Sequence, residues 1–135
     1  MKELSSYPFS SWIRFKPLKF IWKHLRNKLV LNLYIQKKQN LLDDFLIKCQ
    51  SLKDENIILV TAFEQPWVLE WLLYMSDKYV TDATILVFDN SKDLNARKEI
   101  QKVCERSNTL YLPLPKNPTT HVNRSHALAM QWIYD

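Results

Sequence analysis

The sequence predicts an α/β fold in which helices cover both faces of a parallel sheet. Strand-like and helix-like segments alternate through residues 54–135. The strand-like segments are continuous apolar runs, which is typical of strands buried on both faces. The 135 residues, 47% of them hydrophobic, suffice for one domain with a single core. We therefore expect a three-layer Rossmann-like sheet over 54–135, preceded by a basic helical arm over 1–53.

The arm is expected to contain a long amphipathic helix. Pro17 suits its first turn, where the missing N–H of proline is not needed. Apolar residues then recur at intervals of three and four, as on one face of a helix: Leu18, Ile21, Trp22, Leu25, Leu29 and Leu33. A second helix is expected over roughly 41–52. Residues 1–53 carry eleven Lys and Arg against three Asp and Glu, a net charge of +8, whereas 54–135 carry eight against eleven, net −3.

Two interpretations of this amphipathic helix remain open. Its apolar stripe can pack on the domain core, or it can lie in a membrane interface with lysines toward anionic headgroups, so that residues 12–38 bind a membrane surface. Nucleic-acid binding is disfavoured because the lysines are interleaved with a regular apolar stripe. The chain start lacks the features of a secretory signal, and no 18 apolar residues run together. These features favour a cytoplasmic location, or a peripheral one at the inner membrane face.

The α/β part begins with the apolar, β-branched run NIILVTAF at 56–63, which reads as a strand. Pro66 then starts a helix that reaches about Tyr79. We expect the apolar side of this helix to consist of Val68, Leu69, Leu72 and Leu73, with Met75 and Trp71.

The second strand is expected at 83–89, ATILVFD. Asp93 or Asn95 caps the following helix, whose inward residues are Ile100, Val103 and Cys104. A third strand is expected at 109–115, weakened by Pro113 because proline cannot donate to a sheet ladder. A last helix starts at Arg124 or Ser125.

The composition excludes several common sites. The chain contains no glycine, where average usage of about 7% predicts roughly nine. A Walker loop, a G-x-G-x-x-G turn and a kinase glycine-rich loop are therefore ruled out. Cys49 and Cys104 form no zinc motif, and the spacing of His121 and His126 is no ligand spacing, so no metal site is predicted. No catalytic residue is assigned, since Ser125 beside His126 cannot form a nucleophile and base pair on a helix.

Polar residues follow two of the predicted strands, where a parallel sheet binds ligands. The first strand is followed by Glu64, and the second ends in Asp89 within ILVFDNSKD. The carboxylate of Asp89 can accept hydrogen bonds from ribose hydroxyls or a base N–H. The same D-N-S-K-D run is also good turn chemistry, so a purely structural role for Asp89 stays open.

Three segments, taken in order, resemble the opening half of the family-two glycosyltransferases. They are IILVTAFEQPWVLEWLL, ILVFDNSKDLNARKEI and LPKNPTTHVNRSHALAMQWI. The resemblance covers about residues 56–135 and rests on order and spacing. It implies the GT-A fold and a nucleotide-diphospho-sugar donor. Asn117 and the run from 123 to 127 look like the loop and helix of that family, without its glycines.

Carried over to this sequence, the resemblance implies a set of donor-binding residues. Thr61, Phe63 and Glu64 would surround the nucleotide base, and Asp89 with Asn90 would contact the uracil or ribose. Asn123 and His126 would lie toward the pyrophosphate. An ordinary hydrated position at the start of a helix remains the alternative for His126.

The sequence departs from the family at its end. Family members continue into a strand with an Asp-x-Asp motif that holds a divalent cation, Mg²⁺ or Mn²⁺, and later supply a catalytic base. Neither is present before Asp135. The expectation is thus a truncated, incomplete or frameshifted glycosyltransferase that binds donor without transferring sugar, and whose incomplete sheet favours self-association. The alternative is a non-catalytic module that binds a membrane surface or a partner.

Overall fold

The computed structural model describes residues 17–119 and 121–135. Its contacts divide the chain into two units, with the division between Leu33 and Tyr34. Helix α2 (Pro17–Ile35) crosses this division and ends two residues after it. Pro17 is its first residue, as the sequence predicted. The predicted membrane segment at 12–38 lies in part outside the described residues, at 12–16.

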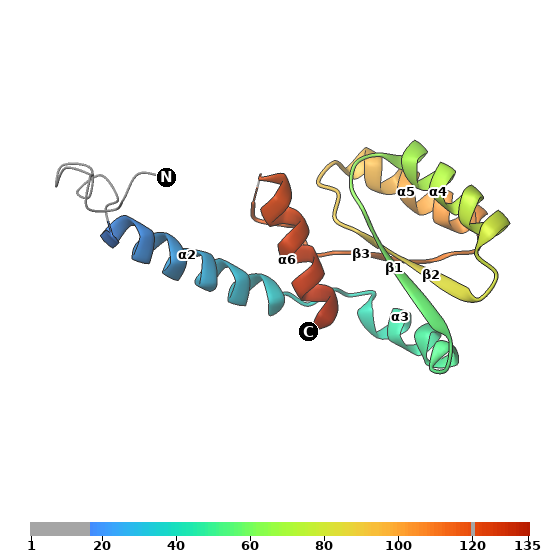
Figure 1. The fold of residues 1–135 in the computed structure, drawn as a ribbon, viewed down its shortest axis with the longest axis horizontal. Helices are drawn as coiled ribbons and strands as arrows, with labels where there is room; N and C mark the ends of the chain where they lie inside the picture. Colours follow the sequence, from blue (N-terminus) through green and yellow to red (C-terminus); the bar gives the residue numbers. More distant parts are fainter. Residues whose placement is uncertain (1–16, 120) are drawn as a thin grey trace, which may run out of the picture. The chain divides into compact units, whose positions relative to one another are not determined.

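The second unit is α/β, which confirms the predicted fold class at that level. The three strands form one parallel sheet in the order β1-β2-β3. In chain order, its elements are α3 (Leu42–Cys49), the 3-10 turn η2 (Gln50–Leu52), β1 (Asn56–Ala62), α4 (Pro66–Tyr79), β2 (Ala83–Asp89), α5 (Leu94–Arg106), β3 (Leu110–Pro113) and α6 (Val122–Tyr134) (Figure 1).

The register of the sheet brings the carboxyl ends of the three strands together. Ala62 of β1 pairs with Asp89 of β2, and Asp89 pairs with Pro113 of β3. The residues that follow these positions therefore meet at one edge of the sheet. Ligands of open parallel sheets bind at this edge.

Helices cover both faces of the sheet, and each face has its own hydrophobic core. The side chains of β2 alternate between these two cores. Val87 faces α4 and α5, together with Leu69, Leu73, Ile100, Val103 and Cys104. Leu86 and Phe88 face the other way, toward α3 and α6, together with Phe45, Leu112, Ala129 and Trp132. The continuous apolar character of β2 is thus explained by burial on both sides.

Residues 34–53 belong to the α/β unit, although the sequence assigned them to the arm. Tyr34 is buried, and its hydroxyl donates to the carbonyl oxygen of Pro115 at 3.2 Å. Phe45 of α3 packs edge-on against Phe88 of β2, with 5.5 Å between ring centroids. Trp132 of α6 donates its indole N–H to the carbonyl of Lys37 at 3.1 Å. These contacts link residues far apart in the sequence, which explains why the boundary falls before Tyr34.

Several details differ from the sequence-based expectation. Strand β3, expected at 109–115, covers only Leu110–Pro113. The expected place of Trp71 on the apolar side of α4 is wrong, since 63% of its surface is exposed. Trp71 is two positions from both Leu69 and Leu73, and about 100° of rotation per residue puts it on the opposite side of the helix. Helix α6 begins at Val122, ahead of the expected Arg124 or Ser125.

Strand β1 forms one edge of the sheet. Within the part of the chain that the structure describes, no strand pairs with its outer side. Ile57, Ile58 and Leu59 are 37 to 42% exposed there. The strand contains no charged residue and no proline, the features that usually protect an edge from pairing with another chain. Self-association through this edge remains a prediction.

Candidate functional site

A cavity of about 320 Å³ lies at the carboxyl edge of the sheet. Three segments that are distant in sequence form it, the end of β1, the end of β2 and the first turn of α6. The lining residues are Thr61, Phe63, Asn90, Val122, Asn123, Ser125 and His126. The structure thus brings together five of the seven residues predicted for donor binding, all except Glu64 and Asp89.

The parallel register and the position of α6 explain why these residues meet. Thr61 pairs with Phe88, so the residues after Thr61 and those after Phe88 emerge side by side. Helix α6 lies against β1, where the Thr61 hydroxyl donates to the sulfur of Met130 at 3.4 Å. This contact holds the middle of α6 against β1, and the first turn of α6 lines the same cavity as Thr61.

Asp89 is among the residues that do not line the cavity. It has 0% of its surface exposed, and partners inside the protein occupy its carboxylate. Oδ1 accepts from the backbone N–H of Ser91 at 2.8 Å, and Oδ2 accepts from the hydroxyl of Tyr111 at 2.9 Å. The Arg97 Nε lies 4.0 Å from Oδ2. Asp89 therefore holds the loop after β2 in place from the interior of the protein.

Arg97 and Tyr111 were not identified from the sequence. Arg97 donates to the carbonyls of Ser91 and Leu114, at 2.7 and 2.8 Å, and so joins the loops after β2 and β3. Burial raises the pKa of the Tyr111 phenol, and the negative charge of Asp89 raises it further. Tyr111 therefore stays protonated and donates to Asp89. No local sequence pattern identifies either residue, because each one contacts the end of another strand only in the folded protein.

Glu64 links the loop after β1 to the loop after β2. Its backbone N–H donates to the hydroxyl of Ser91 at 2.7 Å, and its carboxylate accepts from the backbone N–H of Lys92 at 3.3 Å. Its φ of 52° lies in the left-handed region, which glycine usually occupies. In a chain without glycine, a glutamate with two anchoring hydrogen bonds holds this conformation.

Two of the lining residues, Asn90 and Ser125, belong to a buried hydrogen-bonded cluster that also contains Asn117. The Asn90 side-chain amide donates to the hydroxyl and the carbonyl of Ser125, at 3.0 and 3.3 Å. The Asn117 amide donates to Asn90 Oδ1 at 3.1 Å and to the Ser125 carbonyl at 2.9 Å. Among the described residues no buried side-chain N or O atom lacks a partner. Asn90 therefore shapes the cavity, while its amide is already engaged inside the protein.

Asn123 and His126 are two polar side chains of the lining that stay available to a ligand. Both are exposed at the start of α6, and neither side chain hydrogen-bonds to another residue in the described ranges. The N-cap residue His121 makes no side-chain cap hydrogen bond, and the first turn contains no acidic residue. The partial positive charge at this helix end is therefore not neutralised locally.

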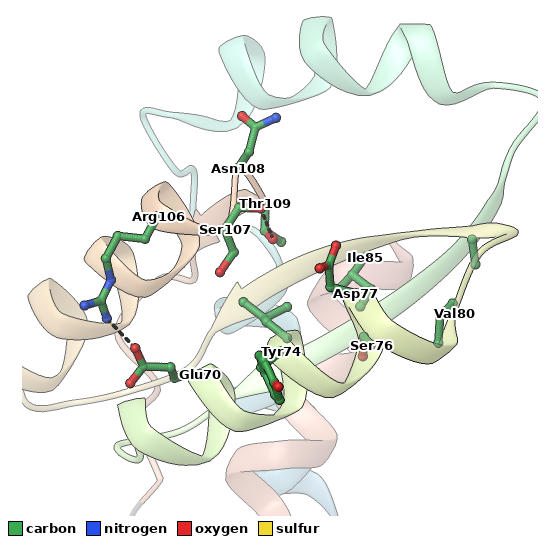
Figure 2. Close-up of a pocket in the computed structure, with 12 residues that line it drawn as sticks. Glu70, Tyr74, Ser76, Asp77, Val80, Ile85, Arg106, Ser107, Asn108 and Thr109 are labelled. Atoms are coloured by element: carbon green, nitrogen blue, oxygen red, sulfur yellow. Dashed lines mark hydrogen bonds and ion pairs between the residues drawn. The ribbon is translucent and has the colours of Figure 1, made fainter.

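A second cavity, of about 590 Å³, lies at the other end of the sheet (Figure 2). Glu70 and Arg106 form an ion pair at 2.8 Å in its lining, between α4 and α5. Ala83 and Thr109 also line it, which places it at the amino ends of β2 and β3. We favour the smaller cavity as the functional site because ligands of parallel sheets bind at the carboxyl ends of strands.

No cluster of three or more His, Cys, Asp or Glu in residues 17–119 and 121–135 could hold a metal ion. Comparisons of the chain with protein-family models, with curated proteins and with solved structures found no match. The resemblance to glycosyltransferases therefore depends on the residues of this chain alone.

Proposed function

We propose that this chain binds a nucleotide-diphospho-sugar at the carboxyl edge of its sheet, as the nucleotide-binding half of a GT-A glycosyltransferase. One observation carries the proposal. Residues that the sequence predicts from three separate segments line one cavity at the edge where parallel sheets bind ligands. Its volume of about 320 Å³ is at the lower end of the range for small-molecule sites, roughly 300–1,000 Å³.

The cavity residues offer suitable chemistry for a nucleoside. Phe63 supplies an aromatic face for a base. Among the described residues, the Thr61 hydroxyl donates to a thioether, a weak acceptor, and can exchange it for a carbonyl or hydroxyl of the ligand. The carboxylate of Asp89 can act directly only if its internal network opens. In the closed network it fixes the loop that carries Asn90.

The start of α6 suits the diphosphate. Its first backbone N–H groups have no partner within the helix, and the helix dipole favours an anion there. Arg124 lies in this first turn, and Asn123 and His126 can donate hydrogen bonds. A nucleotide whose base lies near Phe63 could thus extend its phosphates toward α6.

Sugar transfer needs more than this chain offers within the described residues. The diphosphate leaving group requires a divalent cation, Mg²⁺ or Mn²⁺, and the acceptor hydroxyl requires a base. We therefore propose donor binding as the step that residues 54–135 can perform. In an enzyme of the family that the sequence resembles, the sugar would pass to a glycan or a lipid-linked acceptor.

Titration of the full chain with uridine, guanosine and adenosine diphosphates, followed by isothermal calorimetry, tests the proposal. Asn123→Ala should weaken binding of the preferred nucleotide about tenfold, since one or two hydrogen bonds are lost. Asn95→Ala is the matched control because Asn95 is an exposed asparagine at the same second position of α5. Its binding should stay within about twofold of the parent.

His126→Ala provides a second probe from the same helix. If the phosphates lie at α6, it should weaken nucleoside diphosphate binding but leave binding of the nucleoside alone unchanged. Absence of binding to all three diphosphates at millimolar concentration, by a folded chain, would refute the proposed function. Equal effects of Asn123→Ala and Asn95→Ala would place the nucleotide elsewhere.

A further inference from the structure

Helix α2 carries an apolar stripe that is exposed. Its members are Ile21, Trp22, Leu25, Leu29 and Leu33, each 53 to 70% exposed. With about 100° of rotation per residue, all five lie within roughly 60° of a common line along the helix. We call this surface the α2 stripe. Exposed apolar surfaces of this extent usually mark an interaction site.

The charges around the α2 stripe have a single sign. Residues 17–35 contain four Lys and Arg and no Asp or Glu. Arg26 and Lys28 flank the stripe on opposite sides, at roughly 70 to 90° from its centre. Lys23 lies further round, on the polar side. Apolar side chains flanked by cations on both sides match a surface that is apolar below an anionic layer.

The helix is not suited to cross a bilayer. No helix within residues 17–119 and 121–135 is long and apolar enough to span a membrane. The 19 residues of α2 have a length of about 28 Å at 1.5 Å per residue, close to the apolar thickness of a bilayer. Cations within this length would then lie in the hydrocarbon, at a large cost. Lying in the plane of the interface satisfies both the stripe and the charges.

We propose that α2 binds the surface of a lipid bilayer that contains anionic headgroups, with the α2 stripe inserted at the acyl boundary. A second copy of this chain fits less well. A two-helix seam requires apolar residues at alternating spacings of three and four, and the seam that runs through Trp22, Leu25 and Leu29 reaches Asn32 next. Pairing of two α2 helices would also bring their positively charged flanks together, whereas anionic headgroups would neutralise these charges.

Co-sedimentation of the full chain with lipid vesicles tests this proposal. The vesicles contain phosphatidylcholine alone, or phosphatidylcholine mixed with phosphatidylglycerol. We expect binding to the mixed vesicles, weakened by added salt because screening reduces the attraction of exposed charges. Arg26→Gln with Lys28→Gln, which removes the two flanking cations, should weaken it roughly 25-fold, at about fivefold for each charge removed. Lys98→Gln with Lys102→Gln on α5 is the matched control and should change it less than twofold.

The apolar part of the proposal has its own pair of variants. Leu25→Glu with Leu29→Glu should abolish vesicle binding while circular dichroism of the chain stays unchanged. Leu46→Glu with Ile47→Glu, at exposed positions of α3, should leave binding intact.

Three outcomes would overturn the inference: equal binding to both vesicle types, equal effects of the α2 and α3 variants, or no vesicle binding together with dimers that Leu25→Glu dissociates. The last would identify a second copy as the partner of the α2 stripe. The inference does not depend on the proposed nucleotide site, because nucleotide titration and vesicle binding are separate measurements.

Discussion

Replacing Tyr111 by phenylalanine tests how much the hydrogen bond from Tyr111 to Asp89 stabilises the protein at the candidate site. The Tyr111 hydroxyl donates to Asp89 Oδ2 at 2.9 Å, and Asp89 is fully buried at the carboxyl end of β2. Phenylalanine keeps the ring and removes only this donor. The Arg97 Nε, at 4.0 Å, is too distant to replace it by a hydrogen bond. A buried carboxylate oxygen is then left without a hydrogen-bond donor.

The expected cost follows from this geometry. A hydrogen bond to a charged group contributes about 1.5–3 kcal/mol, and an unsatisfied buried acceptor loses a similar amount. We expect Tyr111→Phe to lower the free energy of unfolding by about 2 kcal/mol. For a chain of this size, that corresponds to a decrease of roughly 8 °C in Tm, at about 4 °C per kcal/mol.

Urea unfolding followed by circular dichroism measures this cost. Tyr134→Phe is the matched control because Tyr134 is exposed on α6, and it should change the free energy of unfolding by less than about 0.5 kcal/mol. Equal stability of Tyr111→Phe and the parent would refute the reasoning. It would mean that water replaces the lost donor at Asp89, and that Tyr111 does not hold this side chain in place.

Three further predictions concern pH, backbone conformation and the sheet edge. Burial raises the pKa of Tyr34 and of Cys104 to about 12, and it also raises the pKa of Tyr111. The stability that these protonated side chains contribute is therefore complete below about pH 9 and is lost toward pH 12. Urea unfolding at several pH values should show this decrease. Asn108 has a φ of 51°, so Asn108→Gly should leave Tm unchanged or higher, whereas Asn108→Val should lower the free energy of unfolding by about 1–2 kcal/mol. Ile58→Lys, on the open edge of β1, should reduce self-association measured by sedimentation equilibrium, and an unchanged association constant would contradict a role for that edge.

Local signals predicted most element boundaries. The predicted ranges for α4 and β2 agree with the structure, because Pro66 marks a helix start and because β2 is the central strand, whose apolar run is uninterrupted. Asp93, one of the two residues expected to cap α5, caps it through its side chain. The start of α6 was predicted two or three residues late, since no capping side chain marks Val122.

The candidate site was predictable in part. Parallel strands end at a common edge, so the polar residues after β1 and β2 were expected to converge. The sequence could not show which of them face the cavity. Glu64 and Asp89 both turn toward internal partners, and the choice depends on Ser91, Lys92 and Tyr111.

By itself, the sequence determined the order of helices and strands, the parallel sheet and the residues that gather at its carboxyl edge. These follow from side-chain periodicity and strand direction, which are properties of short segments. Only the tertiary structure decided that Asp89 is buried and that residues 34–53 belong to the α/β unit. The physical reason is the same in each case. Burial and hydrogen bonding depend on partners tens of residues away, such as Pro115 for Tyr34 and Phe88 for Phe45, and no pattern within a short segment specifies them.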